Sequence, residues 1–405
     1  ALPSRHGRTL GSPNSTLAQR LREGLAEVGL AGMTAEDEPL RLGNVVITWN
    51  VFQHFYPYHD VVDTGWDEVL GTALERALAD RNRDDFQATL QWMVAQLQDG
   101  HGGVYGPSPD APLAGLPIAM DWIEDQVVVV ASDAPGLLQV GDVIERLDGL
   151  PAAQVLEERA RTFSGSPQWR RWRALNSFDR GEQGTVAVLT VQRGNRTLNI
   201  TVPRDAVQRP AEPRPENIEE IEPGVFYVNL DLVEIEAFQA RVEDLARAEG
   251  VIFDLRGYPN GNHMALTHLW DEHLQSAHWN VPQITYPDRA GEPRFAESRW
   301  NLPPSEPRFE GKIVFLTDGR AISYAESVMG IVEYYGLGEI VGQTTAGANG
   351  NVNPFTLPGG WRITWTGMRV VKHDGSQHHM VGIRPTIPAE RTLQGVLEGR
   401  DELLE

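Results

Sequence analysis

One serine in this chain lies where a nucleophile would be placed, between an apolar strand and a helix. Residues 313–317 are apolar and typical of a buried strand, and a turn containing Gly319 leads on to Ser323. Residues 325–335 then have the periodicity of a helix. The first N–H groups of a helix lack intrahelical partners and carry partial positive charge, which would stabilise an oxyanion. A serine at this position is also a common helix N-cap, so the segment alone leaves both roles open.

A second apolar strand is predicted at residues 250–255, and it ends in charged residues. It runs into residues 257–261, a loop rich in turn-forming residues. Glycine in this loop permits the close backbone approach that an oxyanion donor needs. The same loop would also serve as a simple connection from a strand to a helix.

A histidine follows a predicted helix end early in the chain. Apolar residues recur at steps of three and four over residues 86–97, which indicates one face of an amphipathic helix. Asp84 or Asp85 can cap its start, and Asp99 with the following glycine marks its end. His101 is therefore expected in a loop just past the helix. An imidazole with a pKa of about 6.5 suits a general base, although a histidine here can also cap the helix C-terminus.

In this order, these segments resemble peptidase family S41, the tail-specific and tricorn-type serine peptidases. The resemblance spans roughly residues 100–400. Residues 140–144 and 147–149 are similar to parts of the family's PDZ module. The family-like motifs are Asp254-Leu255-Arg256 with Pro259 and Gly261, Ser323-Tyr324-Ala325-Glu326, residues 341–347 and residues 381–385.

The resemblance implies an α/β (α+β multidomain) fold, with a crotonase/ClpP-like ββα catalytic core, a PDZ-like β domain and an N-terminal helical domain. Alternating strands and helices from about residue 216 onward fit such a core. We expect residues 1–111 to form the helical domain that carries the base. Residues 112–207 would form the PDZ-like domain, and residues 208–405 the catalytic domain.

A lysine base is improbable in this chain. The tail-specific branch of the family uses a lysine about twenty-five residues after the serine, but residues 347–350 contain none. The chain has only two lysines. Lys312 begins the strand before Ser323, and Lys372 lies far beyond it.

The tricorn-like branch instead uses a histidine from an early segment, and residues 98–101 are similar to that segment. The resemblance therefore implies acyl transfer in which His101 removes the proton of Ser323. Gly100 stands where the family often has a serine that assists the histidine. The usual tetrad is thus incomplete here.

The third catalytic group is less clearly marked. Glu326 lies one turn after Ser323 and is the first candidate, although a carboxylate there also complements the helix dipole. The tricorn-type glutamate is missing from residues 374–380, where Gln377, His378 or His379 are the alternatives. The backbone N–H groups of Gly261 and Tyr324 are the predicted oxyanion hole.

The PDZ-like domain is expected to add a peptide as a strand and to bind its terminal carboxylate. Gly115, Leu116 and Ile118 are the candidate peptide-binding loop, in which Pro117 lacks an N–H group. The alternative is a PDZ-shaped spacer without a ligand.

Composition narrows the choice of partners. The formal net charge of −21 disfavours nucleic acid and anionic membranes, and no apolar run approaches the roughly 18 residues of a membrane helix. The absence of cysteine excludes disulfides and thiolate chemistry. We expect a peptide or protein substrate and no cofactor or metal. The start at Ala1 and the family's habits favour the periplasm or the cell exterior, with the compartment and oligomeric state left open.

Two other functions fit parts of the sequence. Eleven tryptophans and the missing lysine base suit a catalytically inactive S41-fold protein that binds an apolar ligand or peptide. A metallohydrolase would use His373, His378 and His379 near the C-terminus together with His263. The metal motif His-Glu-x-x-His is absent, and adjacent histidines on a strand point to opposite faces.

Overall fold

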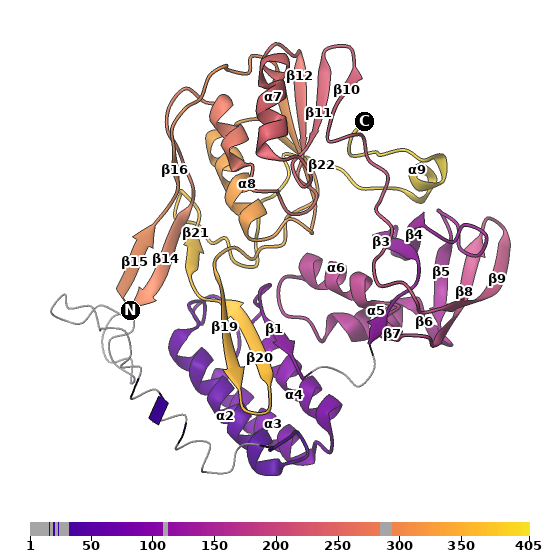
Figure 1. Ribbon diagram of the computed structural model, residues 1–405, viewed down its shortest axis with the longest axis vertical. Coiled ribbons are helices and arrows are strands. Elements are labelled where there is room, and N and C mark those ends of the chain that lie inside the picture. The colour runs from indigo at the N-terminus through magenta and orange to yellow at the C-terminus, as the bar shows by residue number, and fades with distance from the viewer. Residues whose placement is uncertain (1–15, 17–18, 21–22, 24–31, 108–111, 284–293) are drawn as a thin grey trace.

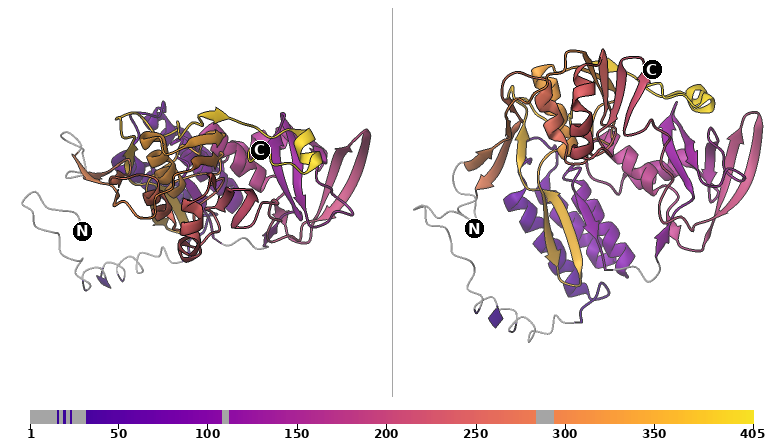
Figure 2. Two further views of the ribbon diagram at one scale, coloured as in Figure 1. Left: turned by 90° about the horizontal axis from the view of Figure 1, so that it is seen from above. Right: turned by 45° about the horizontal axis from the view of Figure 1, so that its top comes forward.

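The computed structural model describes residues 16, 19–20, 23, 32–107, 112–283 and 294–405. The beginning of the predicted N-terminal domain and its boundary at residue 111 lie outside these ranges. Three units with separate hydrophobic cores are visible in Figure 1. The middle unit lies on the opposite side of the molecule from strands β14 (His278–Gln283) and β15 (Arg294–Ser298) (Figure 2).

The N-terminal unit combines helices from the start of the chain with a hairpin from its last quarter. Its elements are α2 (Glu38–Phe55), α3 (Trp66–Ala79), α4 (Arg83–Ala95), β1 (Gly103–Tyr105), β19 (Val352–Leu357) and β20 (Trp361–Thr366). The three strands form a sheet in the order β1-β20-β19. Trp361 and Trp365 of the hairpin share a core with Phe52 of α2. The hairpin belongs to this core, although it lies within the predicted catalytic domain.

Two sequence expectations about α4 need correction. Asn82, not Asp84 or Asp85, caps the helix, because its side chain accepts a hydrogen bond from the backbone N–H of Asp85 at 2.9 Å. The helix ends at Ala95, before the predicted stop. Gly100 serves close packing instead, since a Cβ atom there would lie 2.5 Å from the Cβ of Ala348.

The middle unit is an antiparallel sheet in the order β3-β4-β5-β8-β9, with β6 joined to β5. Helices α5 and α6 pack on one face of the sheet. The short helix α9 (Leu393–Glu398), from the end of the chain, places Val396 on the other face. The elements of this unit are β2 (Leu113–Ala114), β3 (Ile118–Ile123), β4 (Gln126–Ser132), β5 (Val143–Leu147), β6 (Leu150–Pro151), α5 (Ala152–Ala160), α6 (Pro167–Ser177), β7 (Gly181–Glu182), β8 (Val186–Arg193) and β9 (Arg196–Pro203).

The C-terminal unit is built on a sheet in the order β10-β11-β12-β17-β18-β22, parallel from β11 to β22. Its main elements are β10 (Ile218–Glu222), β11 (Val225–Asn229), α7 (Ile235–Ala246), β12 (Gly250–Asp254), η1 (His263–His268), β17 (Lys312–Thr317), α8 (Tyr324–Tyr335), β18 (Glu339–Gly342) and β22 (Ile387–Pro388). Smaller pairings join β13 (Leu274–Gln275) to β16 (Asn301–Leu302), and β14 to β15 and β21 (Arg369–Val371). No helix in the described ranges is long and apolar enough to span a membrane.

Parallel pairing brings the loops that matter to one edge of this sheet. Asp254 is in register with Leu316, and Leu316 is in register with Val341. The loops that follow β12, β17 and β18 therefore leave the sheet at the same edge. In open α/β sheets this edge, outside the carboxyl ends of the strands, is where active sites form.

A buried ion cluster holds the loop after β12. The guanidinium of Arg256 lies 2.6 Å from the carboxylate of Asp254 and 2.7 Å from that of Asp401. Burial raises the pKa of Asp254, but the hydrogen bonds and charge of Arg256, assisted by Arg214, lower it to about 2. The Asp254 carboxylate therefore stays ionised, and Arg256 joins it to Asp401 near the end of the chain.

The shared core predicts that the hairpin is needed for folding of the N-terminal unit. Trp361→Ala removes a side chain with no exposed surface and is expected to lower the free energy of unfolding by about 3–5 kcal/mol. Val352→Ala, in the same hairpin at 48% exposure, is the matched control and should change it by less than about 0.5 kcal/mol. Urea unfolding followed by circular dichroism measures both. Equal stability of the two variants would contradict the shared core.

Candidate active site

Ser323 stands at a sharp turn between β17 and α8. Its backbone has φ +60° and ψ −109°, a region that residues with a Cβ atom rarely adopt. Its side chain makes no capping hydrogen bond to the helix, although the residue occupies the N-cap position. The hydroxyl instead points to the carbonyl oxygen of Gly350 at 3.4 Å. Ser323 is thus the N-cap residue by position, but its hydroxyl does not cap the helix.

His101 is held by a buried hydrogen-bonded chain that sequence reasoning missed. The hydroxyl of Thr366 lies 2.6 Å from Oδ1 of Asp99 and 2.8 Å from Nδ1 of His101. The hydroxyl has one hydrogen, which it donates to the carboxylate, so it accepts the N–H of the imidazole. This places the imidazole hydrogen on Nδ1 and leaves the lone pair on Nε2.

Asp99 accepts hydrogen bonds from both of the other residues in this hydrogen-bonded chain. It is fully buried, and its carboxylate accepts hydrogen bonds from the backbone N–H groups of His101 at 3.0 Å and Thr366 at 2.6 Å. The sequence analysis treated this aspartate only as part of a helix end. Thr366 could not be associated with His101 from the sequence, because the two lie 265 positions apart.

The contacts of His101 and Ser323 converge on one loop. Gly350, whose carbonyl faces the Ser323 hydroxyl, packs so closely on Thr366 that a Cβ atom at Gly350 would lie 2.7 Å from Cγ2 of Thr366. The backbone N–H of Ser323 donates to Ala348 at 3.0 Å, and Ala348 packs against Gly100. Residues 348–350 thus contact the predicted nucleophile on one side, and Gly100 and Thr366, the neighbours of the predicted base, on the other.

Burial lowers the pKa of His101 below its ordinary value, while the charges of Asp99 and Glu326 act in the opposite direction. The net direction is downward. Near neutral pH the imidazole is therefore uncharged and able to accept a proton.

Glu326 holds the loop of residues 345–348, which follows β18, in place. Its buried carboxylate accepts hydrogen bonds from the hydroxyl of Thr345 at 2.5 Å and from the backbone N–H groups of Gly347 at 2.7 Å and Ala348 at 2.8 Å. The ring of His378 is 3.3 Å away. Burial raises the pKa of Glu326, but His378, Thr345 and the N–H of Gly347 hold it below its ordinary value.

The alternatives for the third group have other neighbours. The side chain of Gln377 donates to the carbonyl oxygen of His379 at 2.7 Å. The ring of His379 stacks on Tyr58 with ring centroids 4.0 Å apart, and its Nε2 lies 3.2 Å from the hydroxyl of Tyr56. Burial lowers the pKa of His379 to about 4.

The predicted oxyanion donors lie in two connected segments. The hydroxyl of Tyr324 accepts the backbone N–H of His263 at 3.0 Å and lies 2.8 Å from Nδ1 of that ring. Gly261, two residues earlier, has φ +69°, which favours glycine. The loop after β12 is thereby tied to the first turn of α8.

The candidate peptide-binding loop lies in the middle unit, just before β3. The N–H of Gly115 donates to Ala206 at 2.9 Å, and the N–H of Leu116 donates to the carboxylate of Asp179 at 2.6 Å. The N–H of Ile118 donates within the loop to the carbonyl oxygen of Leu116 at 2.8 Å.

The histidines of the metal hypothesis are dispersed among separate contacts. His263 stacks on Trp300, and His373 stacks on Tyr334. Across the part of the chain that the structure describes, no group of three or more His, Asp or Glu side chains is placed to hold a metal ion.

Comparisons with known proteins bear on the family and the fold of this chain. Residues 226–389 match the model of Peptidase family S41. The structure of mature CPAF complexed with lactacystin has a TM-score of 0.74 at 14% identity and covers 89% of this chain and 96% of its own. A putative peptidase from Parabacteroides merdae ATCC 43184 has a TM-score of 0.54 at 13% identity and covers 91% and 94%. At these identities the structural likeness shows the fold. No curated protein matches the chain.

Together, the family match and the fold define a serine-type peptidase. Residues 226–389, which include α8 and the strands from β12 to β22, are those of an S41 family peptidase. The predicted family and the multidomain α/β fold are thus confirmed.

The hydrogen-bonded chain predicts how Asp99 controls the reactivity of Ser323. Because burial lowers the pKa of His101, the rate of Ser323 labelling by a fluorophosphonate should rise with a midpoint below about 6.5. Asp99→Asn removes a charge that raises this pKa, so the midpoint should move to lower pH. The plateau rate should fall by about 10²–10⁴, because the imidazole loses its fixed tautomer. The exposed Asp133→Asn is the matched control. An unchanged profile for Asp99→Asn would contradict the arrangement.

The contacts of Glu326 predict a large stability effect. Glu326→Gln places an amide NH₂ against N–H and O–H donors, and the free energy of unfolding should fall by about 3–5 kcal/mol. Glu333→Gln changes an exposed carboxylate on the same helix, paired with Lys372, and should cost less than about 1 kcal/mol. Thermal and urea unfolding measure both variants. A Glu326→Gln protein as stable as the wild type would exclude the bracing role.

Proposed function

We propose that the chain is a serine peptidase that cleaves peptide bonds through an acyl-enzyme, with Ser323 as nucleophile and His101 as general base. The observation that carries this proposal is the buried chain Asp99–Thr366–His101, which meets the loop beside Ser323 through Gly350. It supports an imidazole fixed in one tautomer next to a serine held in a strained turn.

The reaction follows from these assignments. Nε2 of His101 takes the hydroxyl proton as Oγ of Ser323 bonds to the carbonyl carbon of the substrate. The imidazolium then returns this proton to the leaving amine as the C–N bond breaks. In the second half, His101 takes a proton from water, hydroxide adds to the ester, and Ser323 leaves as a hydroxyl with its proton restored.

Thr366 and Asp99 act as positioning residues in this mechanism. The Thr366 hydroxyl lies between the carboxylate and the ring, so the negative charge of Asp99 stabilises the imidazolium without direct contact. We assign to this pair the role for which the sequence suggested Glu326, Gln377, His378 or His379. Glu326 serves the mechanism indirectly, by fixing the loop whose Ala348 carbonyl holds the backbone of Ser323.

The backbone N–H groups of Tyr324 and Gly261 are assigned to the oxyanion. The N–H of Tyr324 belongs to the first turn of α8, where intrahelical acceptors are missing. The contact between the Tyr324 hydroxyl and His263 holds the Gly261 loop against this turn. Each such donor typically contributes about 3 kcal/mol to the transition state.

We keep the predicted division into residues 1–111, 112–207 and 208–405, with one addition. The hairpin of β19 and β20 is assigned to the first unit, because it supplies Trp361 to that core and Thr366 to the base. The catalytic site would then lie between the first unit and the catalytic unit. The hairpin would connect the two and fix the position of His101 relative to Ser323.

An inactive S41-fold binding protein for an apolar ligand or peptide is the competing function. Such a protein does not require both a serine at positive φ and an uncharged, partly buried imidazole held by a hydrogen-bonded chain, which are the features that favour the peptidase. A fluorophosphonate distinguishes the two, because only an activated serine reacts.

The decisive experiment compares Ser323→Ala and His101→Gln with the wild type. Both variants should lose at least about 10³-fold in hydrolysis of unfolded casein, because each removes a group that takes part in bond breaking. Ser376→Ala and His54→Gln, at exposed or partly exposed positions, are the matched controls and should retain activity. Fluorophosphonate labelling should be lost in Ser323→Ala. Casein cleavage that survives in Ser323→Ala would overturn the proposal.

A further inference from the structure

The middle unit places one of its own carboxylates against its predicted peptide-binding loop. Strand β3 is an edge strand of the sheet, and α6 packs beside it. In the PDZ mode of recognition a peptide adds to such an edge, and the backbone N–H groups of the preceding loop hold its terminal carboxylate. The loop that would do this here consists of residues 115–117.

The donors of that loop are already in use. The N–H of Leu116 donates at 2.6 Å to Asp179, which follows α6, and the N–H of Gly115 donates to Ala206. Pro117 has no N–H, and Ile118 donates to Leu116. The Asp179 carboxylate therefore has the position and chemistry that an incoming terminal carboxylate would need.

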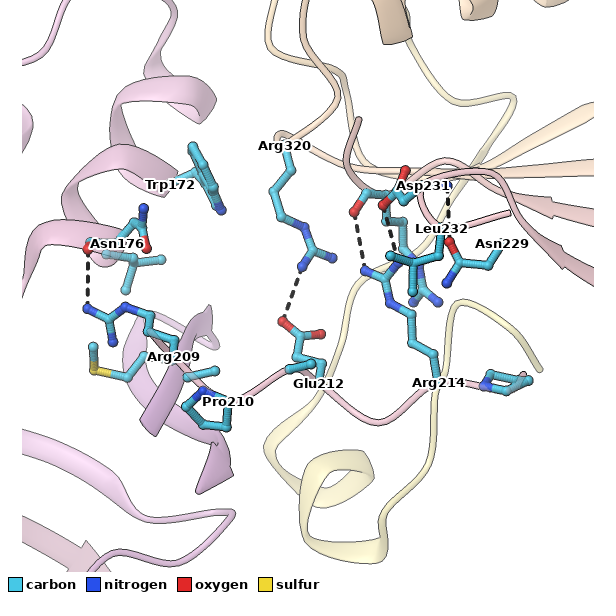
Figure 3. A pocket seen from close by; sticks show the side chains of 16 residues that line it. Trp172, Asn176, Arg209, Pro210, Glu212, Arg214, Asn229, Asp231, Leu232 and Arg320 are labelled. Atoms are coloured by element: carbon cyan, nitrogen blue, oxygen red, sulfur yellow. Dashed lines mark hydrogen bonds and ion pairs between the residues drawn. The ribbon is translucent and has the colours of Figure 1, made fainter. Parts of the chain in front are cut away.

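Asp179 is held there by an arginine from the segment after the domain. It has no exposed surface, and a Cβ atom at Gly115 would lie only 3.1 Å from its Oδ2. Arg209 forms an ion pair with Asp179 and donates to the carbonyl oxygen of Ile118 at 2.9 Å. It also donates to the carbonyl oxygen of Asn176 at the end of α6, as Figure 3 shows. Arg209 thus binds the first carbonyl of the edge strand as well.

Release of this pair would be unfavourable. Displacing Asp179 leaves a buried charge without its partners, and a second carboxylate beside it would be repelled.

The surrounding elements also anchor α6. Ser166 and Gln168 donate to the carbonyl oxygens of Ala346 and Thr345 at 2.6 and 2.8 Å.

The anchoring continues to the catalytic base. The indole N–H of Trp169 donates to the carbonyl oxygen of Gly100 at 2.9 Å, one residue before His101. The middle unit is therefore fastened to the loops around the site by its own helix, and α9 covers the opposite face of its sheet.

We infer that this peptidase does not select its substrates by a free C-terminal carboxylate, because Asp179 and Arg209 occupy the position that would read it. The substrate class is therefore a polypeptide that is recognised without its terminal carboxylate. The middle unit acts as a fixed support for the loops around the base. This inference rests on the proposed peptidase function for its meaning, but its test does not depend on cleavage.

The first test uses a random peptide mixture with free carboxyl termini and the same mixture with amidated termini. Immobilised Ser323→Ala protein retains bound peptides, which mass spectrometry quantifies. Retention of the two mixtures within about twofold, including none of either, agrees with the inference, whereas at least about tenfold enrichment of free carboxylates overturns it. In parallel, the wild type is tested for cleavage of two peptides of the same sequence, one with a free and one with an amidated carboxyl terminus. Failure to cleave either peptide counts against the proposed function, and the retention ratio still decides the inference.

The second test removes the internal carboxylate. Asp179→Ala frees the N–H of Leu116 and the charge of Arg209, and a preference for free carboxylates of at least about fivefold should appear. The exposed Asp133→Ala in the same unit is the control and should show none. A folded Asp179→Ala protein without any preference would show that this loop is not the carboxylate position. If the variant does not fold, the retention ratio of the Ser323→Ala protein with Asp179 intact remains decisive.

Discussion

Buried Asp99 joins the N-terminal helices to the late hairpin through its carboxylate, and to the middle unit through its backbone N–H. It binds Thr366 of the late hairpin through both the hydroxyl and the backbone N–H, and it binds the backbone N–H of His101. The backbone N–H of Asp99 itself donates to the hydroxyl of Ser164 in the middle unit at 2.7 Å. A charge in the interior is tolerated only when such donors surround it, so the units must be in register for Asp99 to be satisfied. The position of the base thus depends on how the late hairpin and the middle unit pack against the N-terminal helices.

Two other buried carboxylates, Glu326 and Asp179, also hold loops in place by accepting hydrogen bonds from backbone N–H groups. Glu326 satisfies three donors of the loop that holds Ser323, and Asp179 satisfies the loop before β3. In each case a buried acidic side chain fixes backbone N–H groups that would otherwise need water or a ligand. Glu326 holds the loop beside the candidate nucleophile, and Asp179 holds the loop before β3. Both side chains accept hydrogen bonds from backbone N–H groups, and they differ in which loop they hold.

The segments with strong local signals were predictable. The strands β12 and β17, the helix α8 and the loop position of His101 follow from apolar periodicity and turn residues, because these patterns reflect which face of an element is buried. The ends of α4 were misassigned, since Asn82 and the neighbouring aspartates all suit a cap and only the local backbone chooses between them. The affiliation of the β19–β20 hairpin was also missed, because its core contacts are with helices some 300 positions earlier.

By itself, the sequence determined the order of the elements, the location of the candidate nucleophile and base, and the family, since each depends on residues close together along the chain. The tertiary structure alone decided which side chains stand behind His101, what Glu326 binds, and that Asp179 fills the loop before β3. These contacts join residues separated by 265, 22 and 63 positions. A buried polar group is satisfied by whichever partner the fold brings within hydrogen-bond distance, and no local pattern encodes that choice.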